Sequence, residues 1–134
     1  MDRYRKALTN AIAVEIFIPK RLKYMGKVYS LLEDELKNRR LRPRVLGFSL
    51  SWVEGAFYGD RQIYDELTSV IRIIFDRENL GMDIKRQEAT LERKVFQLMH
   101  QLAEICEGDE EQFWTVRNDI QVYKLLKKES GGSK

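Results

Sequence analysis

The chain has 134 residues, of which 43% are hydrophobic and 34% charged, so it can fold as one domain and is too apolar for intrinsic disorder. Its single cysteine, Cys106, excludes an internal disulfide, and no run of 18 apolar residues supports a membrane-spanning helix. Residues 1–50 hold 12 Lys and Arg against 5 Asp and Glu, whereas residues 51–134 hold 12 against 16, which gives a net charge of +3. This division indicates one surface for a polyanion and another for protein partners.

The apolar spacing in the first half of the chain predicts two helices, over residues 3–17 and 20–39. Pro19 starts the second helix or kinks a longer one. Both segments place apolar residues at steps of three and four, as on one face of a helix. The residues concerned are Leu8, Ile12 and Ile16 in the first segment, and Leu22, Met25, Tyr29, Leu32 and Leu36 in the second.

Residues 39–50 interrupt this pattern, and Pro43 and Gly47 predict an ordered loop there. Ser51 followed by Glu54 has the spacing of a capping box, which predicts that a further helix begins at this point.

Three more helices are predicted in the second half, from about residue 63 to a stop near residues 79–81, from Asp83 to about residue 107, and over residues 113–126. Asp83 and Asp109 have side chains suited to helix N-caps. The predicted core-facing residues are Ile63, Leu67, Val70, Ile71, Ile74 and Phe75, then Leu91, Val95, Leu98, Leu102 and Ile105, then Phe113, Val116, Ile120, Tyr123 and Leu126. The expected fold class is therefore all-α: a single helical bundle of five or six helices over residues 1–128, followed by a flexible tail over residues 129–134.

Catalytic motifs are not apparent, so we expect no enzyme, no cofactor and no metal site. His100 is the only histidine, which excludes a multi-histidine metal centre. Carboxylates cluster at residues 33–35 and again around Glu110, where the second group lies at a predicted helix start and is explained by capping and solvation rather than by metal binding. There is no glycine-rich phosphate loop, paired-cysteine zinc spacing or nucleophile elbow. Cys106 lies in an apolar stretch and is expected to be a buried, inert thiol.

Positive residues in the first half predict a nucleic-acid-binding face. Lysines recur at steps of three and four opposite the apolar stripe of residues 20–39, and four arginines follow within six residues. Arginine forks match phosphate oxygens, and lysines act as point charges, so the set can follow a DNA or RNA backbone. A solvated helix face with a charged loop is the other interpretation. The candidate residues are Lys20, Lys23, Lys27, Arg39, Arg40, Arg42 and Arg44.

Aromatic residues leave two interpretations open. Tyr4 and Tyr24 could stack on bases or pack in the core. Trp52, Trp114 and their aromatic neighbours are expected in the core or in subunit contacts.

A small chain with this expected helical pattern, a basic face and an acidic remainder resembles the small subunit of CRISPR–Cas effector complexes. The segments 7–44 and 52–75 are most similar to the type I-D small subunit, which derives from the C-terminal domain of the large subunit. The resemblance implies a non-catalytic subunit in which several copies hold a guide–target duplex or a displaced DNA strand without reading its sequence. Its partners would be a nucleic-acid backbone, other protein subunits and copies of itself, with no membrane. The single cysteine fits a reducing compartment, so the expected location is cytoplasmic.

Two other functions remain open. A protein–protein adaptor or scaffold with no nucleic-acid role is suggested by the aromatic residues and the acidic second half. A helix-turn-helix regulator would need a turn near Gly59 and Asp60, but the following segment is too apolar to lie wholly in a DNA groove.

Overall fold

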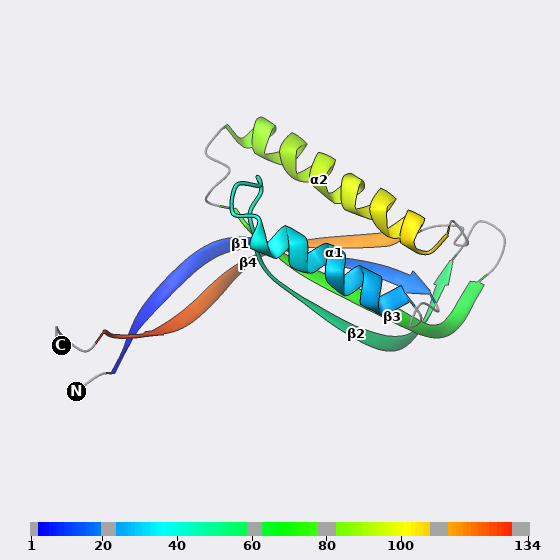
Figure 1. The fold of residues 1–134 in the computed structure, drawn as a ribbon, viewed down its shortest axis with the longest axis horizontal. Coiled ribbons are helices and arrows are strands. Elements are labelled where there is room, and N and C mark those ends of the chain that lie inside the picture. Colours follow the sequence, from blue (N-terminus) through cyan, green and yellow to red (C-terminus); the bar gives the residue numbers. More distant parts are fainter. Residues whose placement is uncertain (1–2, 20–23, 59–62, 78–82, 108–112, 130–134) are drawn as a thin grey trace.

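The computed structural model describes residues 3–19, 24–58, 63–77, 83–107 and 113–129, and their side chains except at positions 19, 55–58 and 63–67. In this part of the chain, four strands form one antiparallel sheet in the order β2-β3-β1-β4, and two helices lie against it (Figure 1). The β-α-β-β-α-β succession is that of a ferredoxin-like fold. The elements are β1 (Tyr4–Pro19), α1 (Met25–Lys37), β2 (Val45–Tyr58), β3 (Ile63–Asp76), α2 (Ile84–Ile105) and β4 (Trp114–Lys127).

The predicted all-α bundle is therefore wrong. The predicted helices that begin near residues 3, 63 and 113 are instead the strands β1, β3 and β4. Ser51 and Glu54 both lie inside β2 rather than at the start of a helix. A spacing of four residues is about one helical turn, but it is also two full repeats of a strand, so it places side chains on one face in either structure. The even spacing of Leu8, Ile12 and Ile16 was thus compatible with both.

Two helices and one loop agree with the sequence predictions in part. α1 lies within the predicted segment 20–39, and the Asp83 side chain caps α2 by accepting a hydrogen bond from the Arg86 backbone N–H at 3.0 Å. The loop after α1 ends sooner than expected, because β2 begins at Val45. Leu22, the predicted cap Asp109 and the tail over residues 130–134 lie outside the described residues.

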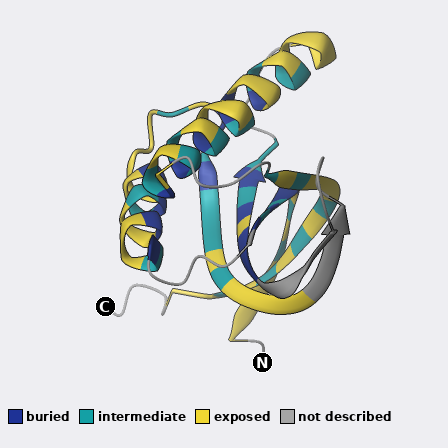
Figure 2. Ribbon diagram, turned by 90° about the vertical axis from the view of Figure 1, so that its right-hand side faces the viewer, coloured by how far each residue is buried: buried dark blue, intermediate teal, exposed yellow. Residues whose placement is uncertain are grey.

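Both helices cover one face of the sheet, and the hydrophobic core lies between these two layers (Figure 2). On β1, side chains at alternate positions 12, 14, 16 and 18 are at most 2% exposed. They pair across the ladder with β3, where Ile71, Ile73 and Phe75 are fully buried. The helices contribute residues including Val28, Leu32, Leu91, Leu98 and Leu102. Cys106 is a free, fully buried thiol, as predicted.

An ion pair is buried between the two helices. Glu35 on α1 and Lys94 on α2 are only 8% and 6% exposed, and the Lys94 Nζ donates to Glu35 Oε1 at 2.6 Å. Glu35 follows the buried Leu32 by three residues, and Lys94 follows the buried Leu91 by three residues. Each charged side chain therefore lies on the buried face of its helix. Of the carboxylates clustered at residues 33–35, Glu35 is therefore buried and paired.

The opposite face of the sheet carries no helix in the described part of the chain, and we call it the open face. The register places alternate residues of every strand there. Ala11 and Ala13 on the central strand β1 are nearly inaccessible, whereas side chains on the edge strands remain exposed. Residues of the open face include Gly47 and Val53 of β2, Val70 and Ile74 of β3, and Trp114, Val116, Asn118 and Ile120 of β4.

The ends of β1 and β4 continue beyond the sheet as a two-stranded arm, in which residues 4–10 pair with residues 121–127 (Figure 1). The ladder between β1 and β3 begins at Ala11. On one side of the arm, Tyr4, Leu8, Tyr123 and Leu125 are each at least half exposed.

Candidate anion-binding site

A basic hollow of about 600 Å³ lies where the C-terminal end of α1, the following loop and the start of β2 approach the base of the arm. The loop is held in place by backbone bonds, because the Asp76 N–H donates to the Arg44 carbonyl at 2.8 Å and the Asn38 N–H donates to the Asp34 carbonyl at 3.2 Å. The hollow is lined by Leu36, Lys37, Arg39, Arg44, Val45, Leu46, Gly47, Ile74, Val122 and Lys124.

Four cations line this hollow, and no carboxylate is among its described lining residues. Lys37 contacts Glu33 at 3.6 Å on the helix surface, an exposed pair that contributes little and is easily exchanged. Arg44 and Lys124 are half-buried, whereas Arg39 is exposed. The hollow therefore combines four cationic side chains with apolar lining residues.

The structure brings together only part of the predicted basic face. Arg39 and Arg44 line the hollow, but Arg40 and Arg42 do not. The Arg42 guanidinium instead donates to the carbonyls of Leu41 at 3.1 Å and Arg39 at 3.4 Å, within its own loop. Lys27 is exposed on α1, ten residues before Lys37, which corresponds to about 15 Å along the helix. Lys20 and Lys23 lie outside the described residues.

Two lysines of the hollow were not among the predicted site residues. Lys37 lies at the end of α1, ten residues after the predicted Lys27, and Lys124 comes from β4, eighty residues after Arg44. The local run of Lys124, Lys127 and Lys128 in the acidic half was the one available signal, and the net charge of that half obscured it.

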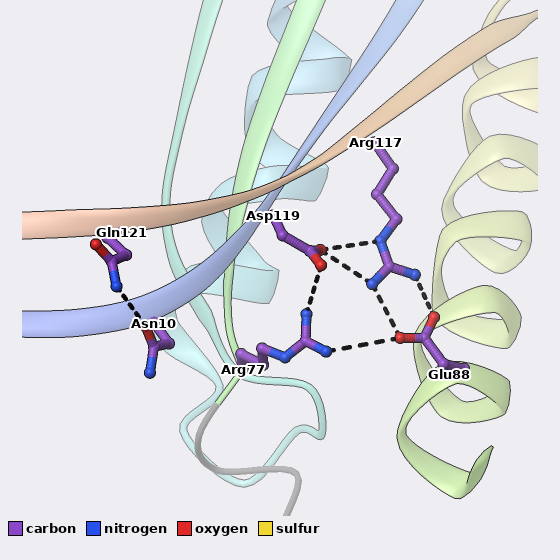
Figure 3. A network of polar contacts seen from close by, with 6 residues as sticks. All are labelled: Asn10, Arg77, Glu88, Arg117, Asp119 and Gln121. Atoms are coloured by element: carbon purple, nitrogen blue, oxygen red, sulfur yellow. Dashed lines mark hydrogen bonds and ion pairs between the residues drawn. The ribbon is translucent and has the colours of Figure 1, made fainter. Parts of the chain in front are cut away.

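A second polar cluster ties β3, α2 and β4 together on the helix-covered side of the sheet (Figure 3). Arg117 donates to Glu88 through both terminal nitrogens, one of them at 2.9 Å from Glu88 Oε1, and to Asp119 Oδ1 at 3.1 Å. Arg77 contacts Asp119 at 2.9 Å and Glu88 at 3.9 Å. Two cations and two carboxylates balance one another, so this cluster is a structural tie rather than an anion site.

The carboxylates of this cluster are held in their ionised form. Hydrogen bonding from Arg117 lowers the pKa of Glu88 below its ordinary value of 4.5. Partial desolvation would raise the pKa of Asp119, but bonds and charge from Arg117 and Arg77 outweigh it and lower this pKa below 3.8. Hydrogen bonds to Glu88 and Asp119 also raise the pKa of Arg117.

We expect Glu88→Gln to lower the free energy of unfolding at pH 7 by no more than about 1 kcal/mol, because the cluster is partly exposed and screened by solvent. A carboxylate with a lowered pKa stabilises the fold above its unfolded pKa, and this contribution disappears as pH falls through the folded pKa. The difference between the wild type and the variant should thus shrink below about pH 4.5. Urea unfolding from pH 7 to 3 measures it. Glu92→Gln, one turn further along α2, is the control, and an equal effect there would contradict the role of the cluster.

Aromatic residues and His100 add no second site. Tyr24 is buried in the core, and Tyr4 is half exposed on the arm. Trp52 and Trp114 are 58% and 39% exposed, so neither is a core residue. His100 is exposed on α2.

No family model and no curated protein matches the chain. Solved structures with a similar arrangement are a nitrogen regulatory PII-like protein, CPII, from Thiomonas intermedia K12 bound to ADP, AMP and bicarbonate (16% identity, 87% of this chain and 98% of that chain, TM-score 0.46) and CutA from Synechococcus elongatus PCC7942 (7% identity, 88% and 85%, TM-score 0.47). A phage SAM lyase in complex with S-methyl-5'-thioadenosine also matches (17% identity, 97% of each chain, TM-score 0.45). None of the three is named as a CRISPR–Cas subunit. Likenesses at this level do not bear on function.

The described part of the chain offers neither a metal cluster nor a spanning helix. Within the described ranges, no group of three or more His, Cys, Asp or Glu side chains could hold a metal ion. Neither of the two described helices combines the length and the apolarity needed to cross a membrane.

Proposed function

We propose that the protein is a binding module that takes up the phosphate group of a nucleotide-sized anionic ligand in the basic hollow. The observation that carries this proposal is the convergence of Lys37, Arg39, Arg44 and Lys124 from three parts of the chain around one concave surface. Arginine presents a fork of donors that matches phosphate oxygens, and hydrogen bonds to charged groups contribute about 1.5–3 kcal/mol each.

The shape of the hollow supports a small organic ligand. Its volume of about 600 Å³ falls within the range of about 300–1,000 Å³ that is usual for small-molecule sites. Leu36, Ile74 and Val122 offer apolar surface for a base or sugar, while the cations hold the phosphate. Gly47 leaves room as well, because a Cβ added there would meet nothing within 4 Å.

Arg39→Ala and Lys124→Ala are each expected to weaken the binding of AMP by about tenfold or more, since each removes one charged donor. Isothermal titration calorimetry with AMP, and competition by inorganic phosphate, measure the change. Arg40→Ala is the matched control, because Arg40 is the exposed neighbour of Arg39 and does not line the hollow. Equal losses for Arg39→Ala and Arg40→Ala, or no binding of AMP by the wild type, would refute the proposal.

Membership of a CRISPR–Cas complex is not proposed further, because the resemblance depended on a helical pattern that the sheet contradicts. Binding of a nucleic-acid backbone stays a prediction that the same series tests. A single-stranded oligonucleotide that binds equally well to the Arg39, Arg40 and Lys124 variants would require a surface other than the hollow.

An adaptor role is the second candidate function. It is favoured by the exposed side chains of the open face, where Trp114 and Val116 of β4 are each about two-fifths exposed on a sheet that no described helix covers on that side. Exposed apolar surface of this kind is typical of protein contacts.

A further inference from the structure

The outer edge of β4 has features of a contact between two copies of the chain. β4 is 14 residues long and pairs only with β1, so along its other edge no strand of the described part of the chain lies beside it. Such an edge presents backbone N–H and C=O groups that can extend the sheet by pairing with a further strand. Two exposed apolar side chains of the open face, Trp114 and Val116, lie on this strand.

The sequence of β4 is complementary to itself when two copies run antiparallel with Asn118 opposite Asn118. In a two-fold arrangement, residues whose numbers add up to the same value face each other. Centring on Asn118 places Arg117 opposite the Asp119 of the second copy, on the helix-covered side. On the open face, the same register places Val116 opposite Ile120 and Trp114 opposite Val122.

Neighbouring registers are unfavourable. Moving the two-fold axis by one residue toward the N-terminus places Arg117 opposite Arg117, and moving it by one residue toward the C-terminus places Asp119 opposite Asp119. Like charges directly opposite each other on paired strands destabilise the pair. The order of charges along β4 thus selects one register from its nearest alternatives, which is a property expected of a strand that pairs with its own copy.

We propose that two copies of the chain associate through antiparallel pairing of β4 with β4, centred on Asn118, to form a continuous eight-stranded sheet. The two-fold axis is perpendicular to the sheet, so the open faces of both copies lie on the same side and all helices on the other. This inference does not depend on the proposed function of the basic hollow.

Asn118→Cys tests the register directly. Residues that face each other in an antiparallel pair have Cα atoms about 4.5–5.5 Å apart, and a disulfide spans about 4.4–6.8 Å. With oxidised glutathione as the oxidant, Asn118→Cys is expected to give a covalent dimer on non-reducing gels. Val116→Cys is the matched control, because in this register residue 116 faces Ile120 of the second copy. The two cysteines at position 116 would then be four residues apart along the paired strands. The wild type controls for Cys106, which is buried.

Charge exchange tests the contact without a cross-link. Val116→Lys and Ile120→Asp are each expected to raise the dimer dissociation constant at least tenfold in sedimentation equilibrium. The double variant should recover dimerisation, because each introduced lysine then faces an introduced aspartate of the second copy. An equimolar mixture of the two single variants should also dimerise, through one such pair and one unchanged Ile120–Val116 pair.

Val53→Lys is the control for a lysine on an exposed edge strand. Val53 is 42% exposed and Val116 43%, and both lie on the open face, but Val53 belongs to β2 at the opposite edge. It should leave the dimer intact. A wild type that is monomeric at all concentrations, cross-linking of Val116→Cys as efficient as that of Asn118→Cys, or failure of both the double variant and the mixture to dimerise would each overturn the proposal. So would an equal loss of dimer for Val53→Lys.

Discussion

Lys94→Met is expected to lower the free energy of unfolding by about 3–5 kcal/mol. Lys94 and Glu35 are both almost inaccessible to solvent, and Lys94 Nζ lies 2.6 Å from Glu35 Oε1 between the two helices. Removal of the ammonium group leaves a buried carboxylate with no opposite charge beside it, and burying an unpaired charge is costly. Urea unfolding followed by circular dichroism measures the change.

The double variant Glu35→Leu/Lys94→Met separates the two contributions. Removing both charges also removes the desolvation penalty, so its stability should return to within about 1–2 kcal/mol of the wild type or exceed it. Lys85→Met is the matched control, because Lys85 is exposed on the same helix, and its effect should stay within about 0.5 kcal/mol. If the double variant were as unstable as Lys94→Met, packing rather than charge would explain the loss.

Phe75→Ala is expected to cost about 3–5 kcal/mol of stability. Phe75 is fully buried on β3 and pairs with Ile12 across the central ladder, so truncation leaves a cavity beneath the helices. Thermal and denaturant unfolding of the purified variant give the value. The slope of the unfolding free energy against denaturant concentration should equal that of the wild type, since the surface exposed on unfolding is nearly the same.

Trp52→Ala is the control for this prediction. Trp52 has the larger side chain, but it is 58% exposed on β2, so its truncation should cost about 1 kcal/mol or less. The contrast tests the sheet itself, because the sequence predicts Trp52 in the core or in a subunit contact. Equal losses at both positions would contradict the described arrangement of β2 and β3.

Part of the candidate site could be predicted from the sequence. The concentration of arginines after residue 38 indicated a place for an anion, and Arg39 and Arg44 do line the basic hollow. That Lys124 lines the hollow could not be predicted, because its position depends on the β1–β4 ladder that brings residues 4–10 beside residues 121–127. Arg39 lines the hollow and its neighbour Arg40 does not. This difference depends on the conformation of the loop, which cannot be derived from the spacing of charges in the sequence.

The sequence by itself determined the features that depend on neighbours along the chain. These are the cap at Asp83 with the helix that follows it, the helix before Asn38, the loop around Pro43 and the apolar surroundings of Cys106. Only the tertiary structure decided that the remaining apolar segments are strands. A strand is stabilised by hydrogen bonds to residues far away in the sequence. Apolar residues spaced by four fit a helix face and a strand face alike, and the steps of three in β3 arise because its apolar side chains lie on both faces, with Val70 and Ile74 on one and Ile71 and Phe75 on the other.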